Sequence, residues 1–543
     1  MKKSSQNGTV TSPKYTLASQ KEKPAFHEYK LDKSERGCCE KCALSGCILG
    51  IIFIIGGIAS AFIIKPFVNN KIIENLALKD GGLAFLGWKD PPVNPVMNVF
   101  FFNLTNKEAF LEGLEKPRVA KVGPYVYVEN IHKVNVTFDT SGDTVTFSDN
   151  KTYFFSPALS TGSESDELIL PNIPLFGAFR RMENDQQQAK SVFEWLLNSY
   201  DFGRDKTPFM RVTVREFLWG YPSVLMSINH MANCNDRPSD EYYKDEDEWG
   251  DMGWGDDDVN DCRFTEATQK QFGFYLGFNQ TVRNQRTVRT GLGDIKNKGL
   301  VTAFEGQTSL GNWPEPRCNA IEGRDPGTLT IGLNKKEELN LYFSNMCRNI
   351  QFQYRKTVEH AGFQTFRFAP VEETFHSPEH YQNNSCFCNS RVCLPSGVFD
   401  MGVGCKPGSP VYISWPHFLH GDPLLRNGVD GLDPPNKEED EFYLDIQPDW
   451  GITLKAHAAF QFNVLVRKNG FSWLNKVKKR VMLPFMMLEE GIAGPSEIIV
   501  EKVKLLMTVA DKVKNLTFLI CVCVGFIFML PEIVLWIKSC CNK

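Results

Sequence analysis

The chain has 543 residues, of which 42% are hydrophobic and 23% charged, and its formal net charge is −4 at pH 7. This balance argues against a nucleic-acid partner, because nucleic-acid-binding surfaces carry a marked excess of Lys and Arg. The first 41 residues are rich in Lys and Ser and poor in large apolar side chains, a composition typical of disordered segments. We expect residues 1–41 to form a disordered tail.

Two apolar stretches, one near each end of the chain, are long enough to cross a membrane. Residues 42–64 contain no charged side chain, and residues 516–537 contain only Glu532. A bilayer core of about 30 Å requires about 20 apolar residues in a helix. The polar segment before the first stretch argues against a cleaved signal peptide. We therefore predict transmembrane helices at 42–64 and 515–537, a large domain at 65–514 and a short tail at 538–543.

Alternating apolar and polar side chains predict strands throughout the domain between the two apolar stretches. The clearest patterns are at 125–129, 134–138, 144–147, 363–368, 410–414 and 460–466. Residues 139–143 have the composition of a hairpin turn. Helical patterns are confined to 106–113, 183–199, 212–219 and 496–514. Because strands dominate and the helices are clustered, the predicted fold class is α+β.

An acidic segment interrupts this domain. Asp240–Asp261 holds 11 carboxylates in 22 residues, with Lys244 as its only base, and Cys234 and Cys262 flank it. The segment fails the EF-hand pattern, which requires a defined series of oxygen ligands and a glutamate at position twelve. We interpret it as a solvated loop closed at its base by a disulfide. Recognition of a cationic partner and loose calcium binding are the alternatives.

Cysteines and glycosylation motifs place the domain outside the cytosol. An even number of cysteines between the apolar stretches predicts a disulfide framework in an oxidising compartment. These eight are Cys234, Cys262, Cys318, Cys347, Cys386, Cys388, Cys393 and Cys405. Five N-x-S/T motifs predict glycosylation of Asn103, Asn135, Asn150, Asn279 and Asn383. We therefore expect an extracellular or lumenal domain, with both tails in the cytosol.

Other cysteines lie beside the apolar stretches, where reversible palmitoylation is common. The predicted sites are Cys38, Cys39, Cys42, Cys540 and Cys541. The Cys39-x-x-Cys42 pair could instead belong to a zinc site, but structural zinc sites normally need a second pair. The third alternative is that these cysteines are unmodified thiols.

Motifs for catalysis and cofactor binding are absent from the sequence. The chain has no G-x-S-x-G, H-E-x-x-H, P-loop or strand-to-helix G-x-G-x-x-G motif. His417 and His420 are three residues apart, but no acidic or cysteine third ligand is apparent near them in sequence. We therefore expect structural histidines, no metal, no cofactor and no enzymatic activity.

Seven motifs, in consistent order between the two apolar stretches, resemble those of the class B scavenger receptor family. They are Gly-Pro-Tyr at 123–125, Phe-Ser-Pro-Ala-Leu-Ser-Thr-Gly-Ser-Glu-Ser-Asp at 155–166, Val-Arg-Glu-Phe-Leu-Trp-Gly-Tyr at 214–221, Cys-Phe-Cys at 386–388, Val-Tyr-Ile-Ser-Trp-Pro-His-Phe at 411–418, Val-Asp-Gly-Leu-Asp-Pro at 429–434 and Tyr-Leu-Asp-Ile at 443–446. The family also contains a fatty-acid translocase and a lysosomal integral membrane protein.

The resemblance implies an antiparallel β-barrel-like ectodomain, capped by a helical bundle and traversed by an apolar tunnel. It further implies a plasma-membrane receptor that binds lipids, fatty acids or sterols, and lipoprotein particles or other polyanionic ligands, and passes lipid to the membrane. A homo-oligomer is compatible with it. A lysosomal lipid exporter or enzyme-sorting receptor is the first alternative, although the tail Lys538–Lys543 lacks the acidic dileucine pattern of that member. The second alternative is a two-span ion channel, a class of protein that has the same topology but lacks these motifs.

The resemblance also implies covalent pairs and ligand contacts. Its cysteine positions imply Cys318–Cys386, Cys347–Cys405 and Cys388–Cys393, which leaves Cys234–Cys262 by elimination. In fatty-acid-binding members a lysine follows the helix that here ends near Ser199, and counting places that lysine at Gly203. The neighbouring cations Arg204 and Lys206 are therefore candidate ligand-binding residues, together with the retained Lys406. The family's glutamate at position 407 is replaced by Pro407.

Overall fold

The computed structural model describes residues 48–56, 58, 71, 74–183, 187–199, 203–227, 270–388, 393–492 and 497–541. The chain divides into two compact units. The central unit is Asn69–Thr508, and the terminal unit combines Met1–Val68 with Val509–Lys543. The predicted tail at 1–41 and the acidic segment with Cys234 and Cys262 lie outside the described residues.

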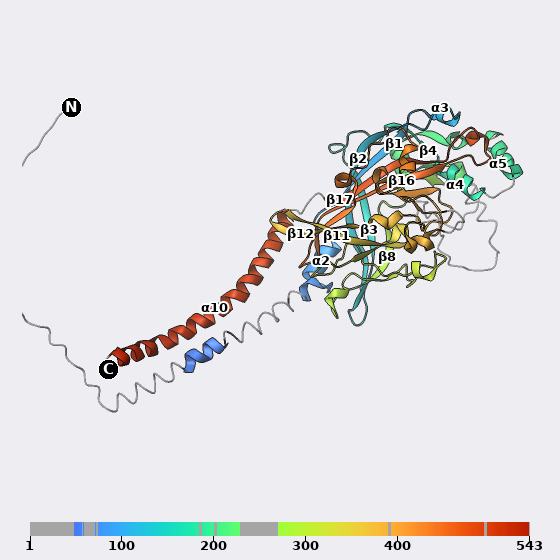
Figure 1. The fold of residues 1–543 in the computed structure, drawn as a ribbon. Coiled ribbons are helices and arrows are strands. Elements are labelled where there is room, and N and C mark those ends of the chain that lie inside the picture. The colour runs from blue at the N-terminus through green and yellow to red at the C-terminus, as the bar shows by residue number, and fades with distance from the viewer. Residues whose placement is uncertain are drawn as a thin grey trace, which may run out of the picture. The chain divides into compact units, whose positions relative to one another are not determined.

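One large antiparallel sheet of 13 strands forms the central unit (Figure 1). Its strand order is β10-β11-β12-β15-β16-β17-β1-β2-β3-β8-β9, with β14 paired to β16 and β13 paired to β14. The strands are β1 (Val96–Leu104), β2 (Val119–Phe138), β3 (Thr144–Phe155), β8 (Thr281–Arg289), β9 (Val301–Phe304), β10 (Leu339–Phe343), β11 (Arg348–His360), β12 (Phe363–Pro370), β13 (Phe399–Asp400), β14 (Val411–Ser414), β15 (Tyr443–Gln447), β16 (Ile452–Val466) and β17 (Val481–Ile492).

Arg324 links the two end strands of this sheet. It forms bridges to Leu300, next to β9, and to Leu341 in β10. Its backbone N–H donates to Asn340 at 2.8 Å, and its carbonyl accepts from Tyr342 at 2.9 Å. The sheet is therefore a nearly closed barrel, an arrangement that leaves few unpaired strand edges.

The remaining strands form two small ribbons. β4 (Glu167–Pro171) pairs with β5 (Phe209–Thr213), and β6 (Tyr221–Pro222) pairs with β7 (Gln271–Phe272).

Helices are short, apart from the last one. They are α2 (Leu83–Lys89), α3 (Lys107–Leu111), α4 (Ile173–Arg181), α5 (Gln187–Ser199), α6 (Val214–Trp219), α8 (Pro423–Asn427), α9 (Lys437–Asp440) and α10 (Glu497–Cys541). Short 3-10 turns are η1 (Gly203–Lys206), η4 (Ile295–Asn297), η5 (Pro316–Cys318), η6 (Ser344–Met346), η7 (Glu372–Phe375), η8 (Gln382–Phe387), η9 (Pro416–Phe418) and η10 (Ser472–Leu474).

Phenylalanine-rich clusters fill the central unit. The largest combines β1, β17, α4 and α6, and its fully buried rings include Phe101, Phe217 and Phe485. A second cluster lies along β10, β11, β12 and β15, with Phe352 and Phe368 at its centre. Burial of such rings supplies the main driving force for folding, at about 25 cal/mol per Å² of apolar surface.

The prediction of a mixed helix and strand fold with a large antiparallel barrel is confirmed. The hairpin predicted at 139–143 joins β2 to β3, and Asp139 accepts backbone hydrogen bonds from Gly142 and Thr144. In Figure 1, α3, α4 and α5 gather at the end of the central unit opposite α2. Phe179 of α4 and Phe193 of α5 both pack on Phe471, at ring distances of 4.5 and 6.0 Å.

In the terminal unit, the helical segment at 48–56 contacts α10. The rings of Phe53 and Phe528 are stacked with centroids 5.6 Å apart. A Cβ atom built on Gly50 would lie 2.8 Å from the carbonyl oxygen of Gly525, so the two backbones meet where neither residue has a side chain. Within the described residues, no helix combines the length and apolar character needed to span a bilayer. The two-span topology stays a prediction.

Candidate functional site

Three disulfides tie together the loops beside β10–β14. The structure joins Cys318 to Cys386, Cys347 to Cys405 and Cys388 to Cys393, with Cα–Cα distances of 6.3, 5.2 and 5.7 Å. These are the three pairs that the resemblance implies.

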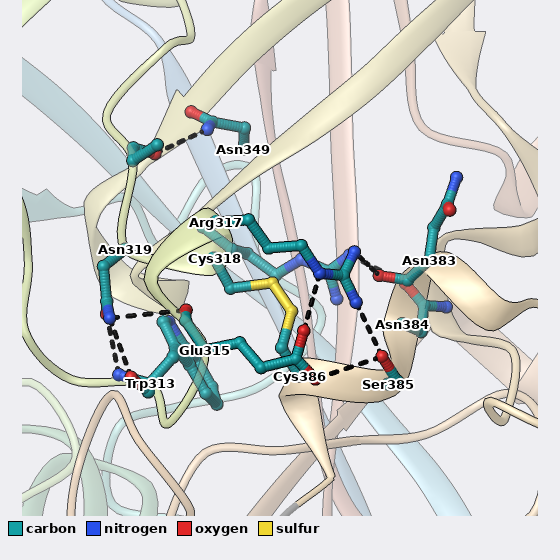
Figure 2. The surroundings of a disulfide bond; sticks show 12 residues. Trp313, Glu315, Arg317, Cys318, Asn319, Asn349, Asn383, Asn384, Ser385 and Cys386 are labelled. Carbon is teal, nitrogen blue, oxygen red and sulfur yellow. Dashed lines mark hydrogen bonds and ion pairs between the residues drawn. A yellow bond between two sulfur atoms is a disulfide. The ribbon is translucent and has the colours of Figure 1, made fainter.

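Arg317 reinforces the first of these bridges (Figure 2). Its guanidinium donates to Glu315 at 2.7 Å, to the carbonyl of Asn383 at 3.2 Å and to Ser385 Oγ at 2.6 Å. One cation therefore binds the residue that precedes η5 and two residues of η8, on both sides of the Cys318–Cys386 bond. The resulting frame fixes the loop that carries the Asn383 motif.

The predicted glycosylation sites differ in exposure. Asn135, Asn279 and Asn383 are exposed, whereas Asn103 and Asn150 are half-buried. The side-chain oxygen of Asn103 accepts from the backbone N–H of Ile169 at 2.8 Å. Glycosylation of these asparagines stays a prediction.

The candidate ligand cations Arg204 and Lys206 share the short turn η1. Arg204 Nη2 donates to Glu216 Oε1 at 3.0 Å, and its guanidinium lies 5.5 Å from the ring centroid of Tyr221. The hydrogen bond from Arg204 contributes most to lowering the pKa of Glu216. Glu216 also completes the capping box of α6 with Thr213. Arg204 therefore already pairs with an acid.

Asp205, between these two cations, anchors the turn. Its buried carboxylate accepts from Ser223 Oγ at 3.0 Å and from the backbone N–H of Val224 at 2.7 Å. Lys206 is half-buried. The third candidate, Lys406, follows Cys405 in a different part of the fold and is only 6% exposed. The structure thus brings Arg204 and Lys206 together and places Lys406 elsewhere.

A charged triad that local sequence patterns did not predict lies inside the barrel. Met97 of β1 pairs directly with Glu490 of β17 and with Tyr127 of β2, so these three side chains lie on the same face of the sheet. Glu129 lies on this face too, because it is two residues from Tyr127 along β2. Lys151 Nζ donates to Glu129 Oε2 at 3.1 Å and to Glu490 Oε1 at 3.3 Å. Burial and the nearby Glu490 raise the pKa of Glu129 to about 7.

An exposed apolar surface lies on α5. Val192, Trp195 and Leu196 are 57%, 62% and 38% exposed, while Phe193 and Leu197 face the core of the central unit. A helix of this kind presents one apolar face inward and leaves a second one in solvent. Exposed apolar patches commonly bind proteins or lipids.

Several predicted sites cannot be placed in this structure. Cys38, Cys39 and Cys42 lie outside the described residues, as do Cys234 and Cys262. Cys540 and Cys541 end α10, and their acylation stays a prediction.

His417 is buried at 4% exposure, and its Nδ1 lies 3.2 Å from the carbonyl of Asp433. Its burial lowers its pKa. Among the residues that the structure describes, no group of three or more His, Cys, Asp or Glu side chains could hold a metal ion.

Comparison with known proteins places this fold in a family. A protein-family model described as "CD36 family" matches residues 48–536 of the sequence. Scavenger receptor class B member 1 of Bos taurus is 28% identical over 90% of this chain and 88% of that protein. The Mus musculus protein of the same name is 29% identical over 82% of this chain and 79% of its own length. Lysosome membrane protein 2 of Rattus norvegicus is 30% identical over 80% of this chain and 82% of that protein. The chain therefore belongs to the CD36 family, which is the class B scavenger receptor family.

Proposed function

We propose that this protein is a non-enzymatic membrane receptor that binds lipids or lipoprotein particles and passes lipid through the interior of its barrel to the membrane. The observation that supports this most directly is the near-closed antiparallel barrel, because barrels of this size can enclose a ligand path. Lipid moving down its own gradient requires a capture site and an apolar path, with no cofactor or catalytic group.

The inner face of β16 supports such a path. Ala456, Ala458, Phe460 and Phe462 alternate along this strand and pack against the core clusters, yet all four are only half-buried. Ala458 is the direct partner of Glu490, and the Glu490 side chain keeps 35% exposure. Small and aromatic side chains that retain exposure on an inward face are consistent with an apolar passage.

We propose that capture begins on α5 and η1. Trp195 and Val192 offer apolar contact with a lipid or lipoprotein surface, and Arg204 and Lys206 lie in the turn that follows α5. A cation in this turn would attract an anionic headgroup or another polyanionic ligand. Lys406 is 6% exposed and lies in a different part of the fold, so it is not part of this capture surface.

We propose the plasma membrane as the site of action, with both termini in the cytosol. The lysosomal membrane is the alternative, and the name of lysosome membrane protein 2 keeps it open. A two-span ion channel receives no support from the family. Surface biotinylation together with lysosomal co-localisation would distinguish the two membranes.

The proposal is tested by obstructing the inner face. Ala458→Trp adds a large ring to the inner face, where Ala458 is the direct partner of Glu490. Thr152→Trp adds the same ring to the outer face of β3, because Thr152 lies next to the inward-facing Lys151 in the strand. Cells expressing each variant at equal surface density would be given particles carrying a fluorescent cholesteryl ester or fatty acid. We expect Ala458→Trp to lower transfer several-fold with particle binding unchanged, and Thr152→Trp to transfer normally. Normal transfer by a folded Ala458→Trp protein would contradict the interior path.

A further inference from the structure

Arg348, the first residue of β11, carries a buried guanidinium group whose charge is balanced by no acid among the described residues. The residue is 6% exposed, and its Nε has no hydrogen-bond partner in the part of the chain that the structure describes. Its Nη2 makes one long hydrogen bond, 3.4 Å, to the neutral Oδ1 of Asn384. Burial lowers the pKa of Arg348 to about 9, so the group is still charged at neutral pH.

Two aromatic rings hold this guanidinium in place. Its centre lies 3.9 Å from the ring centroid of Phe387 and 5.1 Å from that of Phe399. Cation–π contacts of this kind are attractive, but they do not neutralise the charge. A buried charge without a counter-charge destabilises the folded state.

Two other arginines of the central unit, whose side chains are 12% and 11% exposed, pair with acids. Arg286 pairs with Asp149 at 2.7 Å, and Arg367 pairs with Asp445 at 2.7 and 2.8 Å. Asp400 is the one carboxylate in the cavity wall beside Arg348, but Arg180 already binds both of its oxygens, at 2.8 and 3.0 Å. Within the described residues, Arg348 therefore has no carboxylate available to it.

A cavity of about 60 Å³ lies against Arg348. His376, Ser377 and the Cys388–Cys393 disulfide contribute to its wall, together with aromatic and aliphatic side chains. This volume holds several water molecules at about 10–15 Å³ each, which is enough for a small anion and too little for an acyl chain.

We propose that this cavity binds a small monovalent anion, chloride or a short carboxylate, as the counter-ion of Arg348. The anion would accept hydrogen bonds from the part of the Arg348 guanidinium that lines the cavity. Because an anion bound only to the folded state stabilises it by mass action, the folded domain would become more stable as the anion concentration rises. The site is independent of lipid transfer.

The test uses the full-length protein in lipid nanodiscs at constant pH and ionic strength. Gluconate, which is too bulky for the cavity, is replaced stepwise by chloride while the melting temperature and the ³⁵Cl NMR line width are recorded. We expect a saturable rise in melting temperature of about 2 °C or more, and broadening of the chloride line that added acetate reverses. A wild-type protein that shows neither saturable response contradicts the proposal.

Two variants separate this site from general salt effects. Arg348→Met keeps the length of the side chain between the rings, removes its charge and is expected to abolish both responses. Arg289→Met removes an exposed arginine of β8 and should leave both unchanged. Should Arg348→Met fail to fold, Ser377→Asp places a carboxylate in the cavity wall and is expected to lose the chloride response. A response retained in the folded Arg348→Met or Ser377→Asp protein overturns the assignment.

Discussion

Lys151 donates a hydrogen bond to Glu129 at 3.1 Å across neighbouring strands, although no part of the Glu129 side chain is exposed. Among the residues that the structure describes, the other carboxylate oxygen of Glu129 has no hydrogen-bond partner. The same ammonium group also donates to Glu490 of β17. One lysine therefore balances two carboxylates on the inner face of the barrel.

This arrangement predicts that Glu129 weakens the fold at neutral pH. Its pKa is raised to about 7 from 4.5, so the folded state holds the proton more tightly than the unfolded state does. The contribution of Glu129 to the free energy of unfolding is complete below about pH 4.5, and it is lost as the pH rises toward 7. Glu129→Gln should raise the free energy of unfolding at pH 7.5 by about 1–3 kcal/mol and leave it little changed at pH 4.5. Denaturant unfolding at both pH values measures this difference.

The exposed Glu359→Gln variant serves as the control for that experiment, because it removes a carboxylate from the surface of β11. Its stability should follow that of the parent protein at both pH values. A Glu129→Gln protein that is less stable than the parent at pH 7.5 would mean that the ionised carboxylate is needed by Lys151.

The two long-range disulfides should matter more than the short one. Cys347 and Cys405 are 58 residues apart, whereas Cys388 and Cys393 are separated by 5. In the chain-entropy account, the longer loop contributes about 4 kcal/mol and the shorter about 2 kcal/mol. Replacing both cysteines of each pair by serine should therefore lower the melting temperature more for Cys347/Cys405. An equal or reversed order of melting temperatures would argue against this account.

The contact between Gly50 and Gly525 should hold the two helical segments of the terminal unit together. A side chain at Gly50 would collide with Met529 and with the backbone of Gly525, whereas Gly56 has open space around it. Gly50→Leu should therefore separate the helices, and Gly56→Leu should not.

Cross-linking measures this effect. Cysteines introduced at Phe53 and Phe528, whose rings are stacked, should be joined by a short cross-linker in membranes and identified as one linked peptide by mass spectrometry. We expect the yield to fall several-fold with Gly50→Leu and to persist with Gly56→Leu. Equal yields would show that the close approach does not hold these segments together.

The cations of η1 give a test of ligand capture. Replacing Arg204 and Lys206 by glutamine should weaken binding of anionic lipoprotein or anionic lipid vesicles, and more so at low salt, because screening is then weakest. Arg211→Gln is the matched control, since Arg211 is also an exposed arginine paired with an acid. Unchanged binding by the double variant at normal surface expression would remove η1 from the capture site.

The alternation of side chains was sufficient to predict the strand-rich fold, but it could not reveal how distant strands meet. Residues 125–129 and 134–138 were predicted as separate strands, and they form the single strand β2, in which the register shifts between Val134 and Thr137. Asn135 at this irregularity has a positive φ of 52°. Such a bulge interrupts the alternation of side chains, so the sequence pattern predicts that a strand ends there.

The charged groups were less predictable than the fold. Lys151 of β3 meets Glu490 of β17 only because β1 and β17, the first and last strands of the sheet in chain order, are neighbours, which no local spacing in the sequence encodes. Arg348 follows a disulfide cysteine and looks like an ordinary surface cation in the sequence. Its burial between Phe387 and Phe399 is a tertiary property.

The central claim, that lipid passes inside the barrel, is tested most directly by photo-cross-linking. Lipoprotein particles loaded with a diazirine-bearing sterol or fatty acid would be added to cells expressing the protein, irradiated during transfer and analysed by peptide mass spectrometry. The interior path predicts adducts on the inner face of β16, at Ala456, Ala458, Phe460 and Phe462, and none on Thr152. Adducts confined to α5 and other outer surfaces while lipid transfer proceeds would contradict it.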